Sequence, residues 1–221
     1  RNTCGKIKKR NMMKTAAKII SYLFHPLMTG TYCIILMFLT LGPNSIGRMI
    51  EYKIAVTLSM FVTTFVVPAI TFFIMKKKRM ITDLEMSDRK ERTLPYIYTL
   101  LCYAIAIYTM HSMLVPYYVL CMLGAGVVAM AVMCLVNHCW KISAHCCGMG
   151  ALTGFLFVQQ LSYAADFSLP ICFIILLSGA VASARVYLKA HTLMQTLAGY
   201  LTGFSFIFIA GIIGFLIFFN L

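Results

Sequence analysis

Residues 183–195 form a polar, basic interruption between two long apolar runs, and three of their side chains have a spacing with a chemical use. Gln195 follows His191 by four residues, a spacing that brings two side chains together on one helical face. The amide oxygen of Gln195 can then accept a hydrogen bond from one ring nitrogen of His191 and fix its tautomer. Arg185, six residues before the histidine, can hold an anion against it. This segment is therefore a candidate anion-binding or catalytic site.

Two further polar segments carry residue types that suit the same chemistry. They supply Arg89, Lys90 and Arg92, and then Lys141, Ser143 and His145. Phosphoryl transfer through a phosphohistidine needs one imidazole to attack phosphorus, a second to protonate the leaving oxygen, and guanidinium groups to bind the phosphate oxygens. His145 also stands at the predicted start of a helix, where free N–H groups favour an anion.

The composition predicts that these segments are positioned by a membrane protein of the all-α class, a polytopic helical bundle. The 221 residues are 61% hydrophobic and 11% charged, with a mean hydropathy of +0.87, whereas soluble domains are about 45–50% apolar and about 25% charged. We expect a basic juxtamembrane arm at 1–18 and a single transmembrane domain at 19–221, with six to seven spans of about 20 residues. The predicted spans are 19–42, 52–75, 95–112, 116–136, 144–164, 169–185 and 192–219.

The distribution of Lys and Arg predicts which segments share a membrane face. Residues 1–18 and 76–94 contain seven each, and Lys141, Arg185 and Lys189 bring the total to 17 of 19. Seven spans place all of these on one face, which the positive-inside rule assigns to the cytoplasm of an inner (plasma) membrane. The same rule explains the net charge of +13 better than binding to nucleic acid does.

The three polar segments resemble the signatures of the type-2 phosphatidic acid phosphatase superfamily, which includes membrane lipid phosphatases and soluble vanadium haloperoxidases. Its patterns are K-x6-R-P, P-S-G-H and S-R-x5-H-x3-D. The third is the most similar, because Arg185 and His191 are in register, although the serine is displaced to Ser183 and Gln195 replaces the aspartate. Segment 142–145 keeps the serine and histidine of the second signature without its proline and glycine. Segment 88–95 supplies cations and a proline of the first, without the R-P dipeptide.

The resemblance implies a phosphatidic-acid-phosphatase-like core and a role for each residue. His191 would be the nucleophile and His145 the general acid, with Gln195 orienting His191. The phosphate would be bound by Arg185 and Ser143, by Arg89 or Arg92 with Lys90 as the alternative, and by Lys141 as a further cation. A neutral amide stabilises an imidazolium less than a carboxylate does, so we expect a slower enzyme unless the chain compensates elsewhere. The phosphatases of the superfamily work without a metal, and we expect no cofactor in this chain.

These features predict a phosphatase that is embedded in the bilayer and hydrolyses a phosphomonoester or diphosphate of a lipid. A cytoplasmic site suits phosphatidylglycerol phosphate or phosphatidate in phospholipid synthesis. Many bacterial members that recycle polyprenyl diphosphate face the other side, so a polyprenyl diphosphate phosphatase is an alternative. A lipid head-group phosphotransferase and a catalytically degenerate, lipid-binding relative are the others. The sequence leaves the oligomeric state open.

The remaining histidines, cysteines and glycine pairs favour structural interpretations. His25 and His111 are expected to be interfacial, and the nine cysteines to be small buried hydrophobes. The cysteines near His145 lack the C-x2-C pairing typical of a metal cluster. Gly150-x-x-x-Gly154 and Gly199-x-x-x-Gly203 predict close helix packing.

Overall fold

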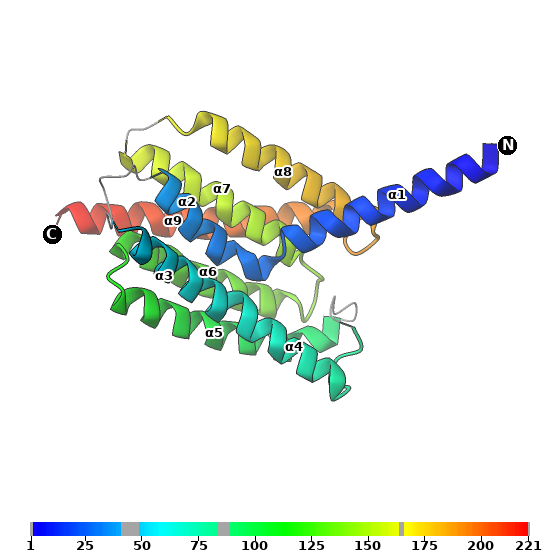
Figure 1. Ribbon diagram of the computed structural model, residues 1–221, viewed down its shortest axis with the longest axis horizontal. Helices are drawn as coiled ribbons and strands as arrows, with labels where there is room; N and C mark the ends of the chain where they lie inside the picture. The colour runs from blue at the N-terminus through cyan, green and yellow to red at the C-terminus, as the bar shows by residue number, and fades with distance from the viewer. Residues whose placement is uncertain (1, 41–48, 84–88, 164–165, 221) are drawn as a thin grey trace.

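The computed structural model describes residues 2–40, 49–83, 89–163 and 166–220, apart from the side chains of 2–8, 89–90, 163 and 218–220. These residues form helices and contain no strand (Figure 1). The helices are α1 (Asn2–Leu23), α2 (Thr29–Thr40), α3 (Ile50–Phe61), α4 (Val67–Lys77), α5 (Thr93–Ser112), α6 (Tyr117–Val136), α7 (Ala144–Tyr163), α8 (Ser168–Tyr187) and α9 (Leu193–Asn220). The prediction of an all-α polytopic bundle is confirmed.

Six helical segments in the described part of the chain are long and apolar enough to cross a membrane. They are Lys9–Thr40, Ile50–Lys77, Thr93–Ser112, Tyr117–Val136, Ser168–Tyr187 and Leu193–Ile217. The 20-residue helix α7 is less apolar than these, and it runs beside α9 between the same two ends of the bundle (Figure 1). The chain is therefore an integral membrane protein whose helices pass six or seven times between the two ends.

The connections sort into two groups at opposite ends of the bundle (Figure 1). Helix α1, the end of α4, the start of α5, the α6–α7 connection and the α8–α9 connection lie at one end, which we call the polar end. The end of α2, the start of α3, the α5–α6 connection and the end of α9 lie at the other. The three segments with candidate site residues thus share one end, as the count of seven spans predicted.

Helices α7 and α9 form a closely packed pair at the centre, held by their glycines. A Cβ atom at Gly150 would collide with the backbone of Tyr200, and one at Gly203 with the backbone of Cys147. Each glycine pair therefore receives the backbone of the opposite helix, an approach that a larger residue would block. The predicted role of both pairs in close packing is confirmed.

The first predicted span, 19–42, overlaps the apolar segment Lys9–Thr40, and a break interrupts its helix. Helix α1 ends at Leu23, and a 3-10 turn at Pro26–Met28 leads into α2. His25 is extended, with φ −66° and ψ 137°, because the ring of a proline disfavours the helical conformation of the residue before it. The predicted boundary at residue 18 falls within α1.

The second predicted span, 52–75, also contains an irregularity. A π-helical turn at Val62–Val66 joins α3 to α4, and the Val67 N–H donates to the Val62 carbonyl. Pro68, directly after this turn, has no N–H with which to continue the regular ladder. The turn places Phe65 in the wall of the cavity described next.

Candidate functional site

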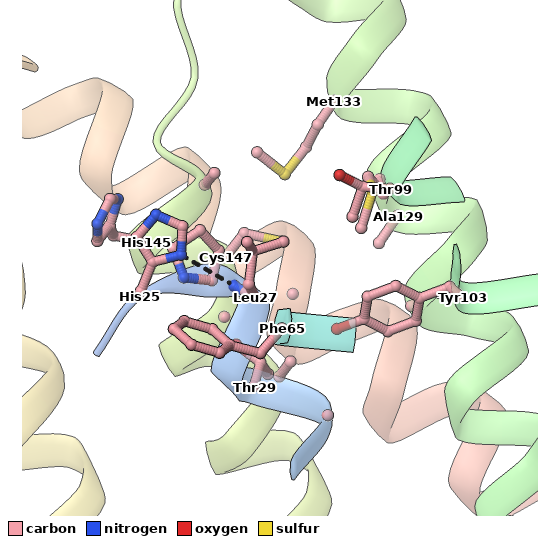
Figure 2. A pocket seen from close by; sticks show the side chains of 18 of the residues that line it. His25, Leu27, Thr29, Phe65, Thr99, Tyr103, Ala129, Met133, His145 and Cys147 are labelled. Carbon is pink, nitrogen blue, oxygen red and sulfur yellow. Dashed lines mark hydrogen bonds between the residues drawn. The ribbon is translucent and has the colours of Figure 1, made fainter. Parts of the chain in front are cut away.

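A cavity of about 470 Å³ opens inside the bundle near its polar end, and we call it the central cavity. Its charged and polar wall includes His25, Arg92, His145, Arg185 and His191. The remainder is mostly apolar and includes Phe65, Met122, Phe155 and Ile207. Figure 2 shows His25 and His145 side by side, across the cavity from Tyr103 and Thr99. The three histidines and two arginines come from the three signature segments and the α1–α2 break, and they border one space.

The end of α8 brings Arg185 and His191 together. Lys189 adopts the left-handed conformation, with φ 55°, and the Ala190 N–H donates to the Arg185 carbonyl at 3.0 Å. These are features of a Schellman end, in which a left-handed residue turns the chain back across the last helical turn. The His191 N–H also points to the Arg185 carbonyl, at 3.4 Å. Both side chains are buried, Arg185 being 4% and His191 7% exposed.

The His191 ring is held by two oxygen atoms at Nδ1. The Lys141 carbonyl oxygen and the Gln195 Oε1 atom each lie 3.3 Å away. Because both are acceptors, Nδ1 carries the proton and the lone pair is on Nε2. The predicted contact between His191 and Gln195 is confirmed. The expectation that both residues lie on one face of a helix is wrong, because α9 begins at Leu193, after His191, and contains only Gln195 of the two.

Gln195 has a second role that the sequence reasoning missed. Its Oε1 atom accepts from the Thr192 N–H at 3.0 Å, and the Thr192 Oγ1 atom accepts from the Gln195 N–H at 3.4 Å. This reciprocal pair is a capping box, whose signature of Thr followed three residues later by Gln is visible in the sequence. Gln195 thus fixes the start of α9 and the His191 ring with the same oxygen atom.

Burial and three positive charges keep His191 neutral. Desolvation, with the charges of Arg92, Arg185 and Lys141, lowers the pKa of His191 to about 4. An imidazole without a proton on Nε2 is the form that can act as a nucleophile. The same three cations would attract an anion to the position next to this nitrogen.

His145 lies in the first turn of α7, where the sequence placed it. Ser143 caps this helix, because its Oγ atom accepts from the Cys146 N–H at 3.5 Å. The Ser143 N–H donates to the Gln195 carbonyl at 3.2 Å, which joins the starts of α7 and α9. Ser143 itself is fully buried and is not among the described residues that line the central cavity. The structure therefore gives Ser143 a capping role, while its predicted contact with phosphate stays a prediction.

The structure distinguishes among the predicted cations. Arg92 is 7% exposed, donates to the Tyr96 hydroxyl and lines the central cavity together with this tyrosine. Lys141 provides its backbone carbonyl to His191 and acts on that ring through its charge. The side chains of Arg89 and Lys90 lie outside the described residues.

His25 is the residue that the interfacial interpretation missed. Its ring lies edge-on to that of His145, with centroids 5.4 Å apart and planes at 76°. The sequence does contain a pattern that could have predicted this, because His25 precedes Pro26 inside an apolar run. A proline there predicts an interrupted helix, and the interruption places the polar His25 side chain within the membrane-spanning part of the bundle.

Comparison of the chain with protein-family models, with curated proteins and with solved structures finds no match. In the described residues, no group of three or more His, Cys, Asp or Glu side chains is placed to hold a metal ion. The functional proposal therefore depends on the geometry of the central cavity.

Proposed function

We propose that this integral membrane protein is a lipid phosphatase that works through a phosphohistidine intermediate. One observation carries the proposal: three histidines and two buried arginines border the polar end of a cavity whose remainder is mostly apolar. Such a cavity suits an amphiphile with a phosphate head and a hydrocarbon tail. The resemblance of the three polar segments to the type-2 phosphatidic acid phosphatase signatures supports the same function.

The proposed reaction has two steps. His145 takes up a proton from the bound phosphate monoanion. The Nε2 lone pair of His191 then attacks phosphorus, and the P–O bond to the lipid breaks while His145 donates that proton to the leaving oxygen. Water then attacks the phosphohistidine, His145 takes a proton from that water, and inorganic phosphate leaves as the N–P bond breaks. Arg185 and Arg92 bind the phosphate oxygens, whose charge changes most in the transition states.

The substrates we propose are phosphatidylglycerol phosphate and phosphatidate, with polyprenyl diphosphate as the alternative. A cytoplasmic polar end would favour the first two, and the Lys and Arg count at that end supports this orientation. A head-group phosphotransferase would use the same first step with an alcohol in place of water. The capping box gives Gln195 a structural role, which favours the lipid-binding, catalytically degenerate alternative.

Orientation can be tested with a native cysteine. Cys139 is exposed in the α6–α7 connection at the polar end, and Ser112 is exposed at the opposite end of α5. A membrane-impermeant thiol reagent should label Ser112→Cys in intact cells and label Cys139 only after lysis. A Cys139→Ser variant identifies the second signal. Labelling of Cys139 in intact cells would contradict a cytoplasmic polar end.

The activity test uses purified protein in detergent with a panel of lipid phosphates. We expect phosphate release that persists in EDTA and is inhibited by vanadate. His191→Ala should abolish release, whereas His138→Ala should leave it unchanged. His138 is a matched control, because it is an exposed histidine at the same end of the bundle. Full turnover by purified His191→Ala protein would refute the proposal.

A further inference from the structure

The break between α1 and α2 is packed against the start of α7. A Cβ atom at Gly148, in the first turns of α7, would meet Thr29 and lie 3.7 Å from the Pro26 Cα atom. The Thr29 side chain therefore packs directly on Gly148, and the turn at Pro26–Met28 lies within van der Waals distance of α7. The break and the first turns of α7 are therefore packed together, and they contain His25 and His145 respectively.

The His25 ring is oriented by its own backbone turn. Its Nδ1 atom accepts from the Leu27 N–H at 3.3 Å, as a cap of the 3-10 turn. An accepting nitrogen carries no proton, so His25 is a neutral imidazole with its proton on Nε2. The ring is thereby fixed edge-on against His145.

The end of α1 also determines which way His145 faces. The His145 ring donates a hydrogen bond to the Ser21 carbonyl oxygen. Ser21 lies in the last turn of α1, where the helix leaves carbonyl groups without helical partners. This bond occupies one ring nitrogen of His145 and leaves the other for the reaction. The hydrogen bond thus selects the nitrogen, while the edge contact with His25 fixes the plane of the ring.

We propose that His25 is a positioning residue that holds the His145 ring in the plane needed to protonate the leaving oxygen. The proposal rests on the proposed phosphatase function and deepens it. It implies that the α1–α2 break, a part of the chain without any of the three signatures, belongs to the catalytic machinery. A general acid contributes about 10²- to 10⁴-fold to a rate, and a small misplacement forfeits a large part of that factor.

The test uses leaving groups that need the acid to different extents. Dodecyl phosphate releases a poor leaving group that requires protonation, and 4-nitrophenyl phosphate releases a good one that does not. Two variants distinguish the contact of the His25 ring with His145 from the hydrogen bond that His25 accepts from the Leu27 N–H. His25→Asn keeps an acceptor for the Leu27 N–H without the ring, and His25→Phe keeps a ring without the acceptor. His111→Asn, at the exposed end of α5, is the matched control.

We expect His25→Asn to lower kcat for dodecyl phosphate about 10-fold or more while changing kcat for 4-nitrophenyl phosphate less than about twofold. His25→Phe should restore most of the loss. Adding His25→Asn to His145→Ala should produce no further loss, because two residues that act through one step are not additive.

Three results would overturn the inference. Equal losses on both substrates would show that His25 serves the fold. Normal kcat in His25→Asn with a loss in His25→Phe would show that only the cap matters. Unchanged kinetics in both variants, in a wild-type protein that hydrolyses both substrates, would show that His25 has no part in catalysis. If the wild-type protein hydrolyses neither, the proposed function itself fails and this inference fails with it.

Discussion

His191 and His145 border the same cavity, but different parts of the chain hold them. Oxygen atoms of Lys141 and Gln195 orient the His191 ring, and both belong to segments that the sequence singled out. The His145 ring is oriented by Ser21 and His25, more than 100 residues earlier in the chain. The proposed nucleophile is thus held by residues of the predicted site segments and the proposed acid by a distant helix break, so the two supports can change independently.

This difference gives each histidine its own set of sensitive positions. Changes near Gln195 should alter the protonation of His191, whereas changes near the α1–α2 break should alter proton delivery by His145. Changes at Arg185 and in the α7–α9 pair should affect both, because Arg185 interacts electrostatically with both rings and this helix pair holds them at one end.

Among changes that affect both histidines, the largest loss of activity is expected from changing Arg185, which interacts with both rings. Arg185→Ala should lower kcat/KM for a lipid phosphate about 10²- to 10³-fold, since it removes a buried cation that we propose binds the phosphate oxygens in the transition state. Arg185→Lys should recover only part of this loss, because an ammonium group cannot bind two phosphate oxygens side by side. Lys14→Ala, an exposed cation on α1, serves as the control and should leave kcat/KM unchanged.

The next effect tests whether the α7–α9 packing keeps the histidines together. Gly203→Ala should destabilise the protein by about 1–3 kcal/mol, because its Cβ atom would collide with the Cys147 backbone. Gly124→Ala is the matched control, since nothing lies within 4 Å of its added Cβ atom. Thermal unfolding in detergent measures both. An unchanged Tm in Gly203→Ala would contradict the close packing.

The pH dependence tests the local support of His191. As the proposed nucleophile, His191 must be neutral to attack, so kcat/KM should be insensitive to its titration near neutral pH and fall only as the pH drops through about 4. Gln195→Glu places a carboxylate beside Nδ1, which stabilises the imidazolium. It should therefore raise the pKa of His191 and move the acid limb upward by about one pH unit or more. An unmoved limb would exclude the His191–Gln195 contact from catalysis.

The smallest effect concerns the capping box. Gln195→Ala should cost about 1 kcal/mol of stability, because the start of α9 loses one half of its reciprocal cap. Gln195→Glu can retain that bond, so its Tm should lie closer to that of the wild type. Equal Tm values for the alanine variant and the wild type would contradict the cap.

The sequence predicted the His191 side of the site better than the His145 side. Arg185, His191 and Gln195 are close in the sequence, so the structure brings them together even though His191 lies outside the helix. The helix count and the glycine pairs likewise depend on apolar length and on local spacing.

The remaining features depend on tertiary packing. The contact between His25 and His145 arises because the α1–α2 break meets Gly148, and no periodicity in the sequence encodes that meeting. Arg92 likewise lies in the cavity wall because of a contact within the fold, its hydrogen bond to Tyr96 in the first turn of α5.

The most direct test of the central claim is to trap and map the intermediate. Purified protein is mixed with a lipid phosphate labelled with ³²P, quenched in alkali, and digested for mass spectrometry. We expect an acid-labile phosphohistidine on His191 that is absent in His191→Ala and accumulates in no other peptide. Phosphate release at the wild-type rate with no phosphohistidine, or with the label on a different residue, would contradict the proposed mechanism.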